Sequence, residues 1–346
     1  MSETTLAPAE EGLAAKRRRV FSGVQPSGKL HIGNYVGALK QWADSQHLCD
    51  NIFCVVDLHA LTIPEQIDPA ELKENSRRVA ALYFACGIDP DESVVFIQSH
   101  VPEHSELAWT LGCVTPLGWL YRMTQFKTKS QQFESVGTGL LTYPTLQAAD
   151  ILLYDTEHVP VGEDQRQHIE LTRDIALRFN HLFGDVFVLP EAVIPRTGAR
   201  IMGLDDPETK MSKSLAVHRP LHSVGLLDDA KTVEKAIMSA VTDSGMETRF
   251  AQAGPGVRNL LTLYHALTGE PEEVMDAKFE GKGYGYLKKT LAQVAIDTLA
   301  PIQARFKELL ADPAELDATL AKGAERARAM AAPTMAKVRR ATGTGG

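Results

Sequence analysis

Two short segments far apart in the chain, His31-Ile32-Gly33-Asn34 and Lys210-Met211-Ser212-Lys213-Ser214, constrain its fold more than any other feature. The first follows a strand-like run, 19–24, and opens a helix-like stretch, 35–47. Glycine there lets backbone amides approach phosphate oxygens, and a helix N-terminus adds partial positive charge. The second places two lysines in a loop after Pro207, where ammonium groups can swing onto a polyphosphate. Together they predict two loops that close around a nucleotide triphosphate.

Strand-like and helix-like patterns alternate through the first part of the chain. We expect strands at 51–57, 93–98 and 185–189, and helices at 70–85, 143–153 and 163–180. This alternation predicts an α/β fold with a Rossmann-like, doubly wound parallel sheet that binds ligands at the carboxyl ends of its strands.

Beyond Ser214 the patterns are helical only, at 224–241, 259–268, 271–279, 286–310 and 313–342. We therefore predict a disordered tail at 1–16, a Rossmann-like catalytic domain at 17–218 and a C-terminal all-helical domain at 219–342.

The composition is that of a soluble globular enzyme. Of 346 residues, 44% are hydrophobic and 23% charged, and the chain is long enough for more than one domain. No apolar run approaches the roughly eighteen residues that a membrane span needs. Residues 1–15 lack an apolar secretory core. We therefore expect a cytoplasmic protein without a membrane partner.

The cysteines and histidines predict no metal site. No Cys-x-x-Cys pair occurs among the four cysteines, which are Cys49, Cys54, Cys86 and Cys113. Their apolar surroundings favour reduced thiols in the core. His100 and His104 have the spacing of helical metal ligands, but Pro102 breaks such a helix, so we expect surface histidines.

The charge is distributed unevenly. The formal net charge of −8 opposes binding to nucleic acid, yet net charge is not local charge. Residues 301–346 hold eight Lys or Arg against five acids, and Lys16 to Arg19 form another basic cluster. Two readings stay open for these regions, a solvated basic face and a surface for RNA.

Five further segments narrow the interpretation. They are Phe21–Gly28, Val56–Ala60, Met123–Lys127, Ala148–Leu152 and Val161–Gln165. With the two segments above, in this order, they resemble bacterial tryptophanyl-tRNA synthetases, which are class I aminoacyl-tRNA synthetases, from about Val20 to Arg340. The resemblance implies ATP-dependent attachment of L-tryptophan to tRNA(Trp) through a tryptophanyl-adenylate, with Mg²⁺ bound to the ATP phosphates. It also implies a homodimer formed through the nucleotide-binding domain, and no DNA partner.

The resemblance implies an ATP site and three catalytic lysines. The ATP-binding residues would be Gln25, Pro26, Ser27, His31, Gly33, Asn34, Gly162, Glu163, Asp164, Ile201, Met202, Lys210, Met211, Ser212, Lys213 and Ser214. Lys129, Lys210 and Lys213 would neutralise charge that develops towards pyrophosphate. Asn34 stands where the class I signature usually has a second histidine. Residues 162–165 are also ordinary chemistry for a helix start.

The implied tryptophan-binding residues are Phe21, His59, Tyr143, Gln147, Asp150 and Gln165. Asp150 lies in an otherwise apolar helical segment, so we expect a carboxylate within the protein that needs hydrogen-bond donors. By resemblance it accepts the indole N–H, a group that can only donate. From the residues alone, an internal cap or ion pair fits equally well, and Phe21 fits a core position. Gln147 departs from relatives that carry methionine there.

Several alternatives stay open. There is no Gly-x-x-x-x-Gly-Lys-Ser/Thr segment, and no Gly-x-Gly-x-x-Gly follows a strand, so a P-loop enzyme and a dinucleotide oxidoreductase are not expected. A tyrosyl-tRNA synthetase, a small-molecule nucleotidyltransferase of the same fold and a non-catalytic RNA-binding paralogue remain as rivals. The apolar, aromatic stretch 109–121 is either a dimer surface or a buried pair of helices.

Overall fold

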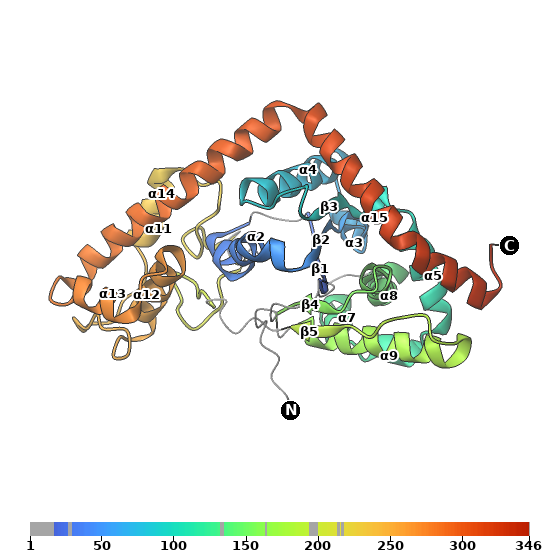
Figure 1. Cartoon of the computed structure of the whole chain (residues 1–346). Helices are drawn as coiled ribbons and strands as arrows, with labels where there is room; N and C mark the ends of the chain where they lie inside the picture. Colours follow the sequence, from blue (N-terminus) through green and yellow to red (C-terminus); the bar gives the residue numbers. More distant parts are fainter. Residues whose placement is uncertain are drawn as a thin grey trace, which may run out of the picture.

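Five short strands form one parallel sheet in the order β3-β2-β1-β4-β5 (Figure 1). The strands are β1 (Arg19–Val24), β2 (Asp50–Val55), β3 (Val94–Ile97), β4 (His158–Pro160) and β5 (Glu191–Val193). The computed structural model describes residues 17–26, 30–131, 135–162, 165–193, 200–212, 215 and 218–345. The predicted Rossmann-like α/β fold is confirmed. The chain runs outward from β1 in both directions, so the switch point lies between β1 and β4, where such sheets bind ligands.

Helices cover the sheet and continue beyond it. They are α1 (Ile32–Asn34), α2 (Lys40–Ser45), α3 (Asp57–Ala60), α4 (Pro69–Ala85), α5 (Glu103–Val114), α6 (Leu117–Tyr121), α7 (Thr124–Ser130), α8 (Thr138–Leu152), α9 (Arg166–Phe183), α11 (Ala230–Met238), α12 (Pro255–Thr268), α13 (Glu272–Phe279), α14 (Gly283–Ala311) and α15 (Pro313–Thr342), with a π-helical turn at Tyr35–Leu39. None of the helices in these ranges is long and apolar enough to cross a bilayer.

The strand predicted at 185–189 is wrong. The backbone there is bonded by a side chain instead of a neighbouring strand: Asn180 Oδ1 accepts from the amides of Val186 and Phe187, and Asn180 Nδ2 donates to the Phe187 carbonyl. Phe187 is buried because its ring packs against Phe179 of α9. The last strand, β5, follows a few residues later. The apolar run therefore marks one buried side chain, Phe187, and no strand.

The cysteine prediction holds only in part. Cys54 on β2 and Cys86 at the end of α4 are buried and free, and Cys49 is half-buried. Cys113 is exposed, so its placement in the core was wrong. Helix α5 buries Leu107 and Leu111 on one face, and Cys113 lies on another.

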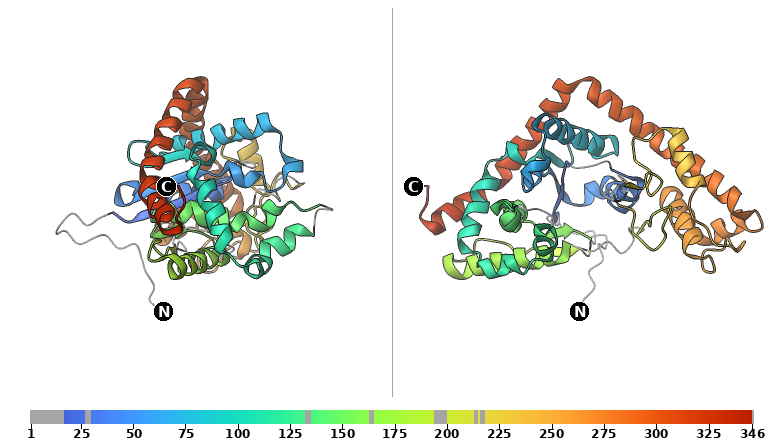
Figure 2. Two further views of the ribbon diagram at one scale, coloured as in Figure 1. Left: turned by 90° about the vertical axis from the view of Figure 1, so that its right-hand side faces the viewer. Right: turned by 180° about the vertical axis from the view of Figure 1, so that it is seen from behind.

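The last two helices form a long arch over the molecule (Figures 1 and 2). Helix α14 packs against α11 and α12 and also against α4. Helix α15 then turns back and packs against β3 and α5. Ala327 and Ala331 of α15 belong to the same buried cluster as Ile52 and Phe96 of the sheet. The division at 218/219 stays a prediction, and α15 lies on the sheet although its sequence follows the helical region.

Basic side chains of α15 bind the sheet-side elements. Arg339 pairs with Glu106 of α5, with Nε 2.7 Å from Oε1. Arg326 donates to backbone carbonyls of Pro90 and Ser93, and Arg328 to that of His100. Part of the C-terminal basic charge therefore docks this helix, an outcome that neither a solvated face nor an RNA surface had predicted.

Gly323 lets α15 approach the sheet closely. A Cβ atom built on Gly323 would lie 1.9 Å from the carbonyl oxygen of Val95 in β3. We expect Gly323→Ala to lower the free energy of unfolding by about 1–3 kcal/mol, because the helix must shift away from β3. Gly285→Ala on α14 is the control, since a Cβ there meets nothing within 4 Å. Alanine favours the helix, so this control should be neutral or stabilising. Thermal unfolding midpoints measure both, and equal midpoints for the two variants would contradict this packing.

Candidate active site

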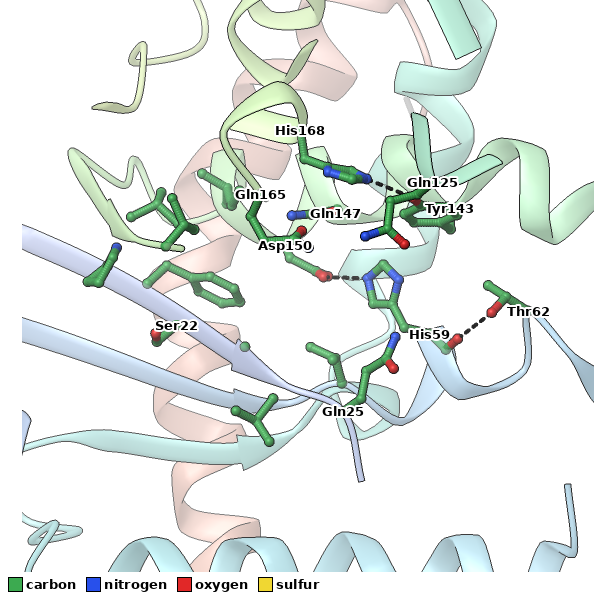
Figure 3. Close-up of a pocket in the computed structure, with 18 of the residues that line it drawn as sticks. Ser22, Gln25, His59, Thr62, Gln125, Tyr143, Gln147, Asp150, Gln165 and His168 are labelled. Carbon is green, nitrogen blue, oxygen red and sulfur yellow. Dashed lines mark hydrogen bonds and ion pairs between the residues drawn. The ribbon is translucent and has the colours of Figure 1, made fainter. Parts of the chain in front are cut away.

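A cavity of about 560 Å³ lies at the switch point of the sheet (Figure 3). Its walls are the carboxyl end of β1 (21–25), the end of β4 (159–161) and side chains from α3, α7, α8 and the start of α9. These elements are far apart in the sequence, and the parallel sheet brings them to one edge. The position agrees with the expectation for an open α/β sheet.

All six predicted tryptophan-binding residues line this one cavity. They are Phe21, His59, Tyr143, Gln147, Asp150 and Gln165. Helix α8 presents three of them, Tyr143, Gln147 and Asp150, at positions i, i+4 and i+7, which share one helix face. Gln25 and Lys129 of the predicted ATP and catalytic residues also line the cavity.

Asp150 is buried and accepts three hydrogen bonds. Its side chain is 1% exposed. His59 Nε2 lies 2.9 Å from Oδ2, while Gln98 Nε2 and His104 Nδ1 lie 2.6 and 2.7 Å from Oδ1. Burial raises the pKa of this carboxyl, but the hydrogen bonds from His104 and His59 outweigh it and hold the pKa well below its usual range. The cavity wall therefore contains an ionised acceptor.

His104 was expected at the surface, and this was wrong. It is fully buried, and its Nε2 lies 2.7 Å from the Tyr154 hydroxyl. Pro102 does not break a helix here, because α5 begins at Glu103, directly after it. His104 thus sits in the first turn of α5 and points inward. A polar residue on the same helix face as Leu107 and Leu111 was the signal that could have revealed it.

His168 is a second residue that the sequence reasoning missed. It is buried on α9, and its Nε2 lies 2.6 Å from the Tyr143 hydroxyl at the cavity wall. Burial raises the pKa of Tyr143 to about 12, so the hydroxyl stays protonated. His168 shares the apolar face of α9 with Ile175 and Phe179. A histidine on that face was the available signal.

Backbone hydrogen bonds join residues 201–202 to residues 210–211, at the start of the lysine segment, and we call this paired segment the strap. Met202 and Lys210 form an antiparallel bridge, and the Met211 amide donates to the Ile201 carbonyl at 3.1 Å. Asn259 of α12 holds Met202 from both sides, accepting from its amide at 2.8 Å and donating to its carbonyl at 3.0 Å. Ile201 and Met211 are buried, and Lys210 is exposed. The strap anchors the backbone and leaves the Lys210 ammonium in solvent.

The segments 31–34 and 210–214 approach each other in the described part of the chain. A Cβ atom built on Gly33 would lie 3.4 Å from Met211 Sδ. The Ile32 amide also donates to the Val224 carbonyl at 2.8 Å, which fixes the helix start against the chain that follows the lysine segment. Asn34 Oδ1 accepts from the His31 amide at 3.1 Å and closes this turn. The predicted approach of these loops is therefore observed.

Some of the remaining predicted ATP-binding residues lie within the described part of the chain, and others lie outside it. Pro26 and His31 are buried, Gly162 is exposed, and the Ser212 hydroxyl accepts from the Leu215 amide at 3.4 Å. Ser27, Glu163, Asp164, Lys213 and Ser214 lie outside the described residues, as does the predicted tail at 1–16. Where the structure describes the chain, no group of three His, Cys, Asp or Glu side chains could hold a metal ion.

Comparison with known proteins gives a consistent result. The family described as "tRNA synthetases class I (W and Y)" matches residues 14–300. Tryptophan--tRNA ligase of Caldanaerobacter subterraneus subsp. tengcongensis is 55% identical over 328 residues, covering 94% of this chain and 98% of that protein. The Bacillus subtilis tryptophan--tRNA ligase is 51% identical over 330 residues, covering 95% and 98%.

Solved structures agree with these relatives. The tryptophanyl-tRNA synthetase of Campylobacter jejuni, complexed with ADP and tryptophan, superposes with a TM-score of 0.82 at 38% identity, covering 94% of this chain and 99% of that one. A tyrosyl-tRNA synthetase of Archaeoglobus fulgidus, complexed with L-tyrosine, reaches a TM-score of 0.65 at 20% identity, with 85% and 91% covered. The second likeness concerns the fold alone.

The hydrogen bonds to Asp150 make stability depend on pH. In the folded protein its pKa lies well below the value of about 4 that an unfolded chain has. The stabilisation is therefore complete above that value. As the pH falls below about 4, the unfolded chain takes up a proton that the folded protein does not, and the stabilisation is lost.

We expect Asp150→Asn to lower the free energy of unfolding by about 2–3 kcal/mol at pH 7, because buried donors lose their acceptor. The gap between wild type and variant should be the same at pH 5 and narrow at pH 3.5. Thermal unfolding at the three pH values measures it, with Asp297→Asn, an exposed carboxylate on α14, as control. A gap that widens in acid would contradict an ionised Asp150.

Proposed function

The chain belongs to the class I tRNA synthetases of the tryptophan and tyrosine family, and we propose that it attaches L-tryptophan to tRNA(Trp) at the expense of ATP. One observation carries the choice of amino acid. The cavity places Asp150, an ionised acceptor, at the buried end of the helix face that also presents Tyr143. Relatives that share half of the residues are tryptophan--tRNA ligases, which argues against the tyrosine-specific alternative.

Recognition of tryptophan rests on the matching of donors and acceptors. Indole N–H can only donate, so the partner must be an acceptor, and Asp150 is held ionised. Phenylalanine would leave this carboxylate without its partner, at a cost that a purely apolar pocket does not impose. Tyr143 and Gln165 would hold the α-amino group at the other end of the cavity, and Phe21 would pack against the indole.

ATP would enter as its magnesium complex beside the amino acid. His31, Gly33 and Asn34 would hold phosphate oxygens at the start of a helix, where backbone amides and the helix dipole favour an anion. Glu163 and Asp164 would bind the ribose, and Ile201 with Met202 would pack against adenine. These roles follow from the family pattern at matching positions of the chain.

The first chemical step is an in-line displacement. An oxygen of the tryptophan carboxylate forms a bond to the α-phosphorus of ATP while the bond to the bridging oxygen of pyrophosphate breaks. Lys129, Lys210 and Lys213 would neutralise the negative charge that builds up on the leaving pyrophosphate. A hydroxyl of the terminal adenosine of the tRNA then attacks the carbonyl carbon, which forms the ester and releases AMP.

The helical region 219–342 would bind the anticodon part of the tRNA. Arg326, Arg328 and Arg339 are engaged with the sheet side, so the RNA contacts would use the other basic groups of this region. Because charging of tRNA takes place where proteins are made, we place the protein in the cytoplasm.

A homodimer through the sheet domain is part of the proposal. Trp109, Leu117 and Tyr121 are 78%, 61% and 53% exposed, which is unusual for large apolar side chains. They lie along α5 and α6, and a second cavity of about 660 Å³ beside Trp109 is lined by Leu58, Leu61, Ala108 and Leu146 among others. The stretch 109–121 buries Leu111 and Leu120 and leaves Trp109, Leu117 and Tyr121 exposed, and a two-fold interface would cover the exposed face.

Amino-acid-dependent exchange of pyrophosphate into ATP tests the function. We expect exchange with tryptophan and none above background with tyrosine. Exchange with tyrosine alone would end the tryptophan assignment, and no exchange with either would favour the non-catalytic alternative.

The lysine roles predict a loss of turnover more than of affinity. Lys129→Ala and Lys210→Ala should each lower the rate of adenylate formation, by about a hundredfold for at least one, because their charge is needed most in the transition state. Lys127→Ala is the matched control: it is exposed on the same helix α7 and does not line the cavity. Single-turnover kinetics separate the two effects. Full turnover with weakened tryptophan binding would refute the assigned role.

The dimer predicts a dependence on Trp109. Trp109→Glu should convert the protein to a monomer at micromolar concentration, because the carboxylate would be buried without a partner in the interface. Val274→Glu, 49% exposed on α13 in the helical arm, should leave the association unchanged. Sedimentation velocity measures both. A wild-type protein that sediments as a monomer and charges tRNA at full rate would exclude the dimer.

A further inference from the structure

The hydrogen bonds of Asp150 leave its two oxygens in different states. Each carboxylate oxygen has two lone pairs. Oδ1 accepts from Gln98 Nε2 and from His104 Nδ1, so both of its lone pairs are engaged. Among the described residues Oδ2 accepts from His59 Nε2 alone, which leaves one of its lone pairs for a further donor, and Asp150 lines the cavity. Figure 3 shows Asp150 and His59 meeting at the cavity wall. A donor in the cavity can therefore bind one oxygen only.

The geometry fixes the direction of each bond around Oδ1. Gln98 Oε1 accepts from the Leu58 amide at 3.1 Å, so the NH₂ group of Gln98 must face Asp150. An ionised carboxylate can only accept, so His104 Nδ1 carries a proton. The other ring nitrogen, His104 Nε2, lies 2.7 Å from the Tyr154 hydroxyl, a group that can both donate and accept, so this nitrogen is also hydrogen-bonded.

Aromatic packing holds this chain of bonds in place. Tyr154 is fully buried, and its ring lies 6.0 Å from that of Phe21, nearly parallel to it. Phe96 of β3 packs against both His104 and Tyr154, with ring centroids 5.7 and 6.1 Å away. These rings pack around the imidazole and hold its position, while the ionised carboxylate keeps a proton on Nδ1.

We propose that His104, held by Tyr154, is a positioning residue that fixes Asp150 with Oδ1 engaged and a single lone pair of Oδ2 turned to the indole N–H. The inference rests on the proposed function of Asp150. His104 and Tyr154 do not line the cavity. They affect selectivity through Asp150, because they prevent a rotation of its carboxylate that would misalign Oδ2 with the indole N–H. Their loss should therefore affect a substrate with an indole N–H and spare one without it.

A pair of substrates isolates this effect. L-Tryptophan and β-(benzothien-3-yl)-L-alanine have nearly the same shape, but the second carries sulfur in place of the N–H. Pyrophosphate exchange would be measured with both for wild type, Asp150→Asn, His104→Leu, His104→Asn and Tyr154→Phe. Tyr83→Phe is the control, because Tyr83 is equally buried but lies on α4, away from this network.

We expect His104→Leu to lower the ratio of kcat/KM for tryptophan over the analogue by roughly tenfold or more, mainly through KM, because a buried acceptor loses a donor. Tyr154→Phe should lower the ratio by a smaller factor. His104→Asn should recover most of it, because an amide can still donate to Oδ1. Tyr83→Phe should leave the ratio unchanged.

The outcomes distinguish the proposed role of Asp150 from the positioning role of His104 and Tyr154. If Asp150→Asn leaves the ratio unchanged, Asp150 does not read the N–H, and the proposed function of this residue fails. If Asp150→Asn lowers the ratio but His104→Leu and Tyr154→Phe do not, only the positioning role is overturned. Equal losses for both substrates would mean a merely structural role. Should His104→Leu fail to fold, Tyr154→Phe decides by the same ratio.

Discussion

An ionised carboxylate buried at the switch point of the sheet is the constraint on which the rest of the site depends. Burial without partners would be severely unfavourable, so donors must converge on Asp150 from several directions. They come from α3 through His59, from the end of β3 through Gln98 and from the first turn of α5 through His104. The Asp150 carboxylate therefore joins these three elements to its own helix, α8. The hydrogen bonds that form the site therefore also hold the elements of the domain together.

The segments proposed to bind the nucleotide are built differently. They are loops and short helix starts, held by backbone bonds such as the Met202–Lys210 bridge and the Asn259 clamp. The amino-acid side must discriminate between side chains, which requires rigid, desolvated groups. In the proposed function the phosphate side stabilises charge that develops during the reaction, a task suited to exposed cations on an anchored backbone. Lys210, exposed on a strap whose neighbours Ile201 and Met211 are buried, has this construction.

The sequence predicted the fold class correctly because secondary structure leaves local signals. The six tryptophan-binding residues were implied by the family resemblance instead, and the structure brings them to one cavity. Alternating periodicity predicts a parallel sheet, and the turn segments carry their own chemistry. His104 and His168 were missed for a physical reason: each acts through a partner, Asp150 or Tyr143, that is distant in sequence. Periodicity places such a residue on a buried face but cannot name its partner. The segment at 185–189 failed similarly, since a side chain of α9 supplied the bonds that a strand neighbour would have made.

The position of α15 shows how the helical region can act on the catalytic sheet. Gly323 allows the helix to rest on the backbone of β3, and Arg339 binds Glu106 at its far end. Strand β3 leads directly into Gln98, and Glu106 lies half a turn beyond His104 on α5. The two elements that α15 clamps are therefore those that supply both donors to Asp150 Oδ1. A displacement of α15 relative to the sheet would therefore act directly on the two elements that hold Asp150 Oδ1.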